Sequence, residues 1–179
     1  FGGWNYYHPV LTGKGYVVFR PNYRGSTGYG DAFLRDMVGH YFNQAHLDVM
    51  TGVDHVIAMG VADPDRLIKM GWSGGGHMTN KLITFTDRFK AASSGAGAAN
   101  WVSMYGQSDV RSYRTPWFGG TPWQEGAPIA VYWEHSPIRE VAILFAGLFA
   151  TMLPALDYLA LHAAQLGVTS PPGFYWASG

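Results

Sequence analysis

A serine flanked by glycines is the part of this sequence whose residue types and spacing predict chemistry most clearly. Residues 71–75 read GWSGG, which has the pattern G-x-S-x-G. An apolar run expected to be a strand precedes this pattern and an expected helix follows it, and in that context the pattern forms a strained turn that exposes a nucleophilic hydroxyl. We therefore predict that Ser73 is a catalytic nucleophile and that the N–H of Gly74, at the start of the helix, donates to an oxyanion.

The glycines on both sides of Ser73 have a steric interpretation. A Cβ atom at Gly71 or Gly75 is expected to collide where the strand and the helix approach each other. The alternative is a glycine-rich turn that binds a phosphate or is only structural. A Walker-type phosphate loop requires Gly-Lys-Ser/Thr, and no lysine follows these glycines directly. The pattern therefore favours a nucleophile.

Alternating strands and helices are expected to position this turn. Short apolar and β-branched runs predict strands at residues 16–20, 67–71 and 89–93. Apolar residues at helical spacing predict a short helix at 31–38 and two longer helices, one with Val49, Val53, Val56 and Ile57 and ending near Gly60, the other with Met78, Leu82 and Ile83. Because alternating strands and helices imply crossovers between parallel strands, the predicted fold class is α/β, with a mostly parallel sheet and flanking helices.

Length and composition exclude several classes of protein. The 179 residues suffice for about one domain, and 47% of them are apolar, as a packed core requires. Because 12 Lys+Arg balance 12 Asp+Glu, neither a disordered chain nor a nucleic-acid partner is indicated. No Cys is present, and no histidines stand at metal-ligand spacing, so no metal site is expected. The sequence begins at Phe1 without a signal-peptide pattern, so we expect a fragment whose compartment stays undetermined.

Four motifs, in this order, resemble a single enzyme family. They are PNYRGSTGYG at 21–30, ADPDRL at 62–67, GWSGGGHMT at 71–79 and HSPI at 135–138. Together they resemble the catalytic domain of the prolyl oligopeptidase family of serine peptidases, in its acylaminoacyl-peptidase and dipeptidyl-peptidase-like branch. The resemblance implies an α/β-hydrolase fold, a Ser-Asp-His triad that cleaves short peptides without a cofactor, and a β-propeller domain upstream. It carries over Ser73 as the nucleophile and the Gly74 N–H as an oxyanion donor.

Both ends of the sequence depart from that family. Residues 1–3, FGG, lie too close to the first expected strand to supply the family's second oxyanion donor. After Glu140, nothing matches the loop with the family's Asp or its later His. We therefore expect a partial α/β-hydrolase domain at 1–140, incomplete at both ends, and a separate segment at 141–179.

The segment 141–179 is apolar and carries one charged residue, Asp157. Three interpretations stay open: a reading-frame slip in the source sequence near codon 140, which we favour, a membrane-associated segment, and a natural C-terminal helix. The uncharged run 141–156 is shorter than the roughly 20 residues of a spanning helix, and Pro154 interrupts it. A membrane partner is therefore disfavoured.

Asp157 and His162 follow Ser73 in the chain order that α/β-hydrolases use for their acid and base. Both fall on one expected helix, whereas a triad acid and base normally lie on separate loops. Solvent-facing helix positions are therefore the favoured interpretation, and a working acid and base the weaker one.

The other histidines are expected to be structural. His77 lies one helical turn after Ser73, so its side chain is expected to pack or to form a hydrogen bond rather than reach the hydroxyl. His135 is expected at a helix end, where a positive charge is favoured. Three more are expected on solvated helix faces: His40, His46 and His55.

Aromatic side chains are the weaker candidates for substrate binding. Trp72 and Tyr29 lie within the motifs and are candidates for a substrate pocket. Residues 106–124, rich in Gly, Pro, Ser and Thr, predict a long loop of the kind that carries binding residues. Arg24 is expected to bond carbonyls of the turn around it. Six further aromatic residues are expected to line a pocket or the core: Trp101, Tyr105, Tyr113, Trp117, Phe118 and Trp123.

Three functions fit these features. The favoured one is a serine peptidase that hydrolyses short peptides through an acyl-enzyme intermediate. A carboxylesterase-like serine hydrolase uses the same turn, and only the substrate pocket separates the two. The third is a truncated, non-catalytic hydrolase domain that acts at most as a binding module.

Overall fold

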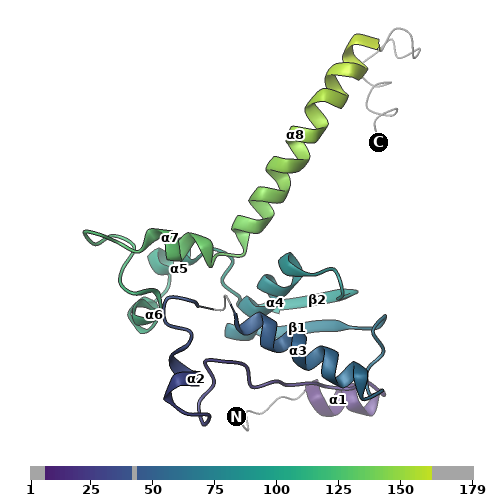
Figure 1. Cartoon of the computed structure of the whole chain (residues 1–179), viewed down its shortest axis with the longest axis vertical. Coiled ribbons are helices and arrows are strands. Elements are labelled where there is room, and N and C mark those ends of the chain that lie inside the picture. Colours follow the sequence, from purple (N-terminus) through teal and green to yellow (C-terminus); the bar gives the residue numbers. More distant parts are fainter. Residues whose placement is uncertain (1–6, 42–43, 163–179) are drawn as a thin grey trace. The chain divides into compact units, whose positions relative to one another are not determined.

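The expected parallel sheet is present. In the computed structural model, which describes residues 7–41 and 44–162, β1 (Ile68–Trp72) pairs in parallel with β2 (Ala91–Gly95) (Figure 1). Ile68 lies opposite Ala91, and Trp72 lies opposite Gly95. The strands predicted at 67–71 and 89–93 are thus confirmed to within two residues. Both strands end at the same edge of the sheet.

Two helices form one layer against this sheet. α4 (Gly74–Phe85) connects the strands and contacts both of them, and α3 (Ala45–Ala58) contacts α4. These are the two longer helices predicted from apolar spacing, and the predicted end of α3 is confirmed by Gly60, whose φ is 71°. Of the apolar face predicted on α4, Met78 and Leu82 are buried.

Side chains on β1 alternate between the two faces of the sheet. Lys69 points toward α4, where its Nζ donates to Thr79 Oγ1 at 3.1 Å. Burial lowers the pKa of Lys69 to about 8. Ile68, Met70 and Trp72 are on the opposite face and are exposed.

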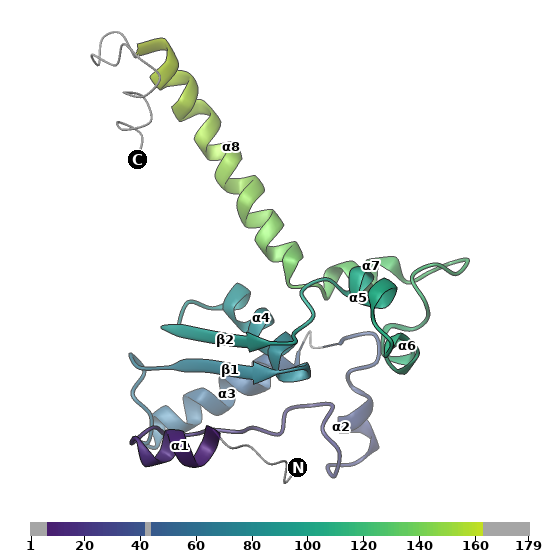
Figure 2. The ribbon, with the colours of Figure 1, turned by 180° about the vertical axis from the view of Figure 1, so that it is seen from behind.

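Three short helices lie beyond the carboxyl ends of the strands (Figures 1 and 2). They are α5 (Trp101–Gln107), α6 (Arg111–Phe118) and α7 (Ile129–Glu134). The core joins them to α3 and α4, and its buried residues are Met37, Tyr41, Ala45, Val49, Met50, Met78, Leu82, Trp101, Phe118 and Tyr132. This shared core fixes the three helices relative to the edge of the sheet where Ser73 lies.

The amino-terminal part differs from the prediction in one element. α1 (Tyr7–Gly13) begins the described chain, and α2 (Asp31–Arg35) confirms the helix predicted at 31–38 over its first five residues. The strand predicted at 16–20 is wrong, since these residues form no strand. Instead Phe19 packs over α3, so closely that a Cβ on Gly52 would lie 2.5 Å from its ring. A β-rich composition predicts a strand only where a neighbouring strand offers its backbone, and here a helix takes up the side chain.

The long loop predicted at 106–124 is also wrong, because α6 occupies its middle. Pro116 lies inside α6, and Gly119 ends the helix in the left-handed conformation, with φ 82°. Glycine and proline are typical of loops, and proline is usually tolerated only in the first turn of a helix. α6 forms although Pro116 lies near its end, so the composition of residues 106–124 was misleading.

Two histidines are more buried than predicted. His46 is buried, with its ring 4.4 Å from that of Phe85, so the prediction of a solvated position is wrong for it, although His40 and His55 are exposed. His135 lies directly after α7, at the predicted helix end, but burial lowers its pKa and its Nε2 lies 3.2 Å from the carbonyl oxygen of Gly39. A neutral ring therefore replaces the expected cation.

A second unit begins after Arg139. Contacts divide the chain into residues 1–139 and 140–179. α8 (Ile138–His162) forms most of the second unit's described part and contains Pro154. Among the residues that the structure describes, no helix is long and apolar enough to cross a membrane.

Candidate active site

The turn at Ser73 has the strained geometry that its sequence predicts. Ser73 has φ 56° and ψ −117°, a conformation that costs a non-glycine residue about 1–3 kcal/mol. Two backbone hydrogen bonds hold it: the Ser73 N–H donates to the Gly95 carbonyl at 2.9 Å, and the Ser73 carbonyl accepts from the His77 N–H at 2.9 Å. Ser73 is exposed at the carboxyl end of β1, directly before α4. Its hydroxyl is therefore available to a ligand.

Of the two glycines at the ends of the motif, only Gly71 is needed to avoid a steric collision. A Cβ on Gly71 would lie 2.0 Å from the carbonyl oxygen of Gly75, which confirms the predicted collision at Gly71. A Cβ on Gly75 itself would meet no atom within 4 Å, so the collision predicted for Gly75 is wrong. Gly75 is the backbone against which Gly71 packs, and only one side of this contact needs glycine.

A second close approach lies next to the first. A Cβ on Gly76 would lie 2.3 Å from the carbonyl oxygen of Gly95, and one on Gly97 would lie 2.5 Å from the carbonyl carbon of Gly76. Between these glycines, Ala96 has φ 49°. We did not predict this contact, although the third glycine of the GGG run and the glycines at 95 and 97 were its sequence signal. It brings the end of β2 against the first turn of α4, beside Ser73.

Arg24 fastens the NYRG turn to α3. Its Nε and Nη2 donate to the two carboxylate oxygens of Asp48 at 2.8 and 2.7 Å, and its Nη1 donates to Gln44 Oε1 at 2.8 Å. Hydrogen bonds from Arg24 lower the pKa of Asp48 below its ordinary value. The structural role predicted for Arg24 is confirmed, but its partners are the side chains of Asp48, Gln44 and Asp36 and not the expected carbonyls of the turn.

His77 is a packing residue, as predicted. It is only 1% exposed, its Nδ1 lies 2.8 Å from the Ala98 carbonyl oxygen, and its ring lies 4.6 Å from that of Trp101. Burial lowers its pKa to about 4. Within the described residues, the Ser73 hydroxyl forms no hydrogen bond with a histidine ring. His77 therefore does not act as the general base for Ser73.

Asp157 and His162 both lie on α8, as the sequence indicated. They are five residues apart, which places them about 140° apart around the helix axis. They therefore do not share a face, and the helix does not favour a direct hydrogen bond between them. They belong to the second unit and stay a weak prediction for the acid and base.

The two aromatic candidates within the motifs are exposed. Trp72 is 73% exposed, and its ring lies against the Gly95 backbone, where a Cβ would be 2.3 Å from Trp72 Cε3. Tyr29 is 57% exposed, and its hydroxyl accepts a hydrogen bond from Asn22 Nδ2 at 2.8 Å. A role for either in substrate binding stays a prediction.

The six further aromatic residues divide between core and surface. Trp101 and Phe118 are buried in the core, and Tyr105 and Trp117 pack against it. Tyr113 and Trp123 are 69% and 67% exposed. The core interpretation thus holds for four of the six.

A parallel sheet with a strained serine at a strand-to-helix turn defines an α/β hydrolase. The chain belongs to the prolyl oligopeptidase family, because the sequence model of that family matches residues 4–156. The match includes the turn at Ser73 (residues 71–75), called the elbow below, and continues to residue 156, beyond the last of the four motifs at 135–138. The family and fold predicted by resemblance are confirmed.

Relatives of this chain are peptidases. An uncharacterised peptidase of Bacillus subtilis, YuxL, is 38% identical over 143 residues, which are 78% of this chain and 22% of that protein. An acylamino-acid-releasing enzyme of Arabidopsis thaliana is 41% identical over 101 residues, 56% of this chain and 13% of that enzyme. The chain therefore spans about a fifth or less of the length of these relatives.

Solved structures agree with this assignment. Acylaminoacyl peptidase of Pyrococcus horikoshii superposes with a TM-score of 0.60 at 28% identity, over 66% of this chain and 19% of that one. An acylaminoacyl peptidase solved in complex with Z-Gly-Gly-Phe-chloromethyl ketone gives a TM-score of 0.60 at 29% identity, with the same two coverages.

Proposed function

We propose that this chain is part of the catalytic domain of a serine peptidase that acts on short peptides, with Ser73 as its nucleophile. The observation that carries the proposal is the exposed Ser73, held at φ 56° where β1 meets α4, in a member of this peptidase family. An acylaminoacyl peptidase of the same fold holds a peptidyl chloromethyl ketone, which supports a peptide as the substrate. We also propose that the full-length protein has the upstream β-propeller domain that the family resemblance implies.

The proposed reaction is acyl transfer from a peptide to water. The Ser73 Oγ forms a bond to the carbonyl carbon as its proton passes to a base, and the amine leaves with that proton. Water then attacks the acyl-enzyme, and the carboxylic acid product leaves as Oγ regains a proton. The N–H of Gly74 is one of the first amides of α4, which have no acceptor within the helix, so it is placed to donate to the oxyanion.

A fluorophosphonate probe tests the nucleophile directly, because it forms a covalent bond with an activated serine. Because a serine without a base is a weak nucleophile, we expect little labelling of residues 1–179 alone, and strong labelling of the full-length protein that Ser73→Ala abolishes. Ser103→Ala is the matched control, since Ser103 is exposed on α5 and its variant should label like the wild type. Absence of labelling in the folded full-length protein, or labelling there that persists in Ser73→Ala, overturns the proposal and favours the non-catalytic interpretation. Faster turnover of small acyl esters than of peptide anilides favours the esterase.

A further inference from the structure

Ser136, in the motif HSPI at 135–138, is a buried serine that the proposed reaction does not use. Its side chain is in the core, and the residue is only 1% exposed. The Ser136 Oγ accepts a hydrogen bond from the Trp101 N–H at 2.9 Å and donates one to the Tyr132 carbonyl at 2.7 Å. Trp101 is the first residue of α5, so its N–H has no acceptor within that helix. The hydroxyl therefore supplies the missing acceptor and connects the start of α5 to α7.

Two neighbours of Ser136 hold the same segment. The carbonyl of His135 accepts a hydrogen bond from the Trp101 indole Nε1–H at 3.0 Å, and the Ile138 N–H donates to the Ala99 carbonyl at 3.1 Å. Residues 96–100 connect β2 to α5 and belong to neither element. The HSPI motif therefore provides hydrogen bonds that fix the end of this connection.

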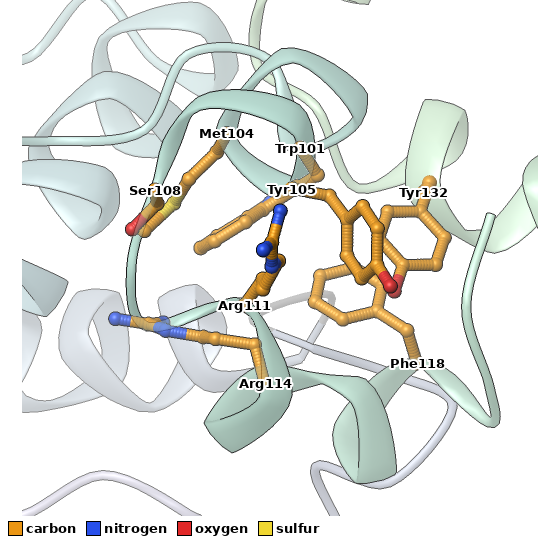
Figure 3. A pocket seen from close by; sticks show the side chains of 8 residues that line it. All are labelled: Trp101, Met104, Tyr105, Ser108, Arg111, Arg114, Phe118 and Tyr132. Carbon is orange, nitrogen blue, oxygen red and sulfur yellow. The ribbon is translucent and has the colours of Figure 1, made fainter. Parts of the chain in front are cut away.

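The side chains of the two residues that Ser136 connects also share a packing partner. The Phe118 ring lies 5.2 Å from the Trp101 ring and 4.3 Å from the Tyr132 ring, between centres (Figure 3). All three residues are at most 2% exposed. Trp101 is thus held through its backbone by Ser136 and through its ring by Phe118, so it has little freedom to move.

The connection between β2 and α5 supports the strained turn at Ser73. The Gly95 carbonyl, at the end of β2, accepts from the Ser73 N–H, and the His77 N–H donates to the Ser73 carbonyl. The His77 ring in turn lies 2.8 Å from the Ala98 carbonyl oxygen, through Nδ1, and 4.6 Å from the Trp101 ring. Both backbone hydrogen bonds of Ser73 therefore involve residues that this connection contacts or contains.

We propose that Ser136 is a positioning residue for the proposed nucleophile: it fixes residues 98–101 against His77, and His77 holds Ser73 in its strained conformation. A residue with φ 56° keeps that conformation only where surrounding contacts impose it, which is why a support at this distance matters. The consequence for catalysis rests on the proposed function, whereas the effect on the turn does not. A purely structural role would instead stabilise the whole unit evenly.

Amide hydrogen exchange of the ¹⁵N-labelled chain, followed by NMR, tests the effect on the turn. We expect Ser136→Ala to speed exchange selectively near Ser73. The amides of Ser73 and His77 should exchange about ten-fold faster relative to the Leu82 amide, which lies further along α4. Val53→Ala, at a buried position on α3, is the matched control for a general loss of stability. That variant should leave the ratio no higher than in the wild type.

Peptidase kinetics of the full-length protein test the effect on the reaction. Ser136→Ala should lower kcat for a peptide anilide about ten-fold with a much smaller change in KM, because it alters the placement of the nucleophile. Ser103→Ala, at an exposed position on α5, is the control and should keep the wild-type kcat.

The outcomes separate this inference from the proposed function. An unchanged exchange ratio in Ser136→Ala overturns the inference, and so does a wild-type kcat in the full-length variant. A raised ratio in a protein that no fluorophosphonate labels supports the positioning of the turn and removes the proposed function. If Ser136→Ala fails to fold, Trp101→Phe removes the indole N–H that bonds the His135 carbonyl and keeps an aromatic ring. It should then raise the same ratio, and an unchanged ratio overturns the inference.

Discussion

The two glycines that flank Ser73 provide a matched test of the geometry of the turn. In Gly71→Ala, the new Cβ would lie 2.0 Å from the Gly75 carbonyl oxygen, so β1 and the first turn of α4 must separate by about 1.4 Å to restore ordinary contact. Both partners are backbone, so no side chain can rotate away. We expect a loss of about 3 kcal/mol of folding free energy, which lowers Tm by about 6 to 12 °C for a chain of this size.

Gly75→Ala makes the same chemical change four residues later and should have the opposite effect. A Cβ at Gly75 meets no atom within 4 Å, and alanine is favoured over glycine in a helix by up to about 1 kcal/mol. Thermal unfolding followed by circular dichroism compares the two variants, and fluorophosphonate labelling shows whether Ser73 keeps its position. Equal changes in Tm for the two variants would refute the packing argument.

Three further predictions concern charged groups. Burial lowers the pKa of His77 to about 4, so the folded protein keeps this ring neutral. The free energy of unfolding should therefore be highest above the ordinary pKa of 6.5 and should fall as pH falls toward 4, by about 2 kcal/mol at pH 5. His77→Gln keeps an N–H for the Ala98 carbonyl, and urea unfolding of this variant should show a weaker dependence on pH. The pKa of Asp48 is lowered by Arg24, so Asp48→Asn should cost about 2 kcal/mol at pH 7, and the difference from the wild type should shrink as pH falls below 4; a constant difference contradicts the assignment. Burial lowers the pKa of Lys69 to about 8, so the wild type should gain stability as pH rises from 8 to 10.5. Lys69→Met should be more stable than the wild type at pH 7 and should lack that gain. The same Tm for both proteins at pH 7 would contradict a destabilising buried charge at Lys69.

Local patterns in the sequence predicted the elements around Ser73 well. The order strand, turn, helix, strand at residues 68–95 follows from apolar runs and glycine positions that act within a few residues of one another. The run of apolar and β-branched residues at 16–20 also predicted a strand, and that prediction was wrong. Phe19 packs on α3, and residues 16–20 do not pair with a strand. Composition identifies a segment that fits a sheet, but the partner strand lies elsewhere in the chain.

Contacts between distant residues explain what the sequence did not predict. Arg24 forms hydrogen bonds with Asp48 and Gln44, which lie 24 and 20 residues later in the chain. No regular sequence spacing connects either residue to Arg24. Arg111 and Arg114 fall in a stretch whose glycines and prolines predicted a loop, so their shared helical face had no signal. Each of these features depends on how helices pack, and packing is decided by the three-dimensional arrangement.

His77 connects the turn at Ser73 to α5. Its backbone N–H binds the Ser73 carbonyl and its ring binds the Ala98 carbonyl, so one residue fixes both the turn before α4 and the segment that leads into α5. With a pKa near 4 the ring is neutral at physiological pH, so it acts by holding position rather than by transferring protons. The ring also packs against Trp101, the first residue of α5. A buried contact therefore fixes the start of α5 relative to Ser73, the proposed nucleophile, as a peptidase needs if the elements around its nucleophile are to position the bond that is cleaved.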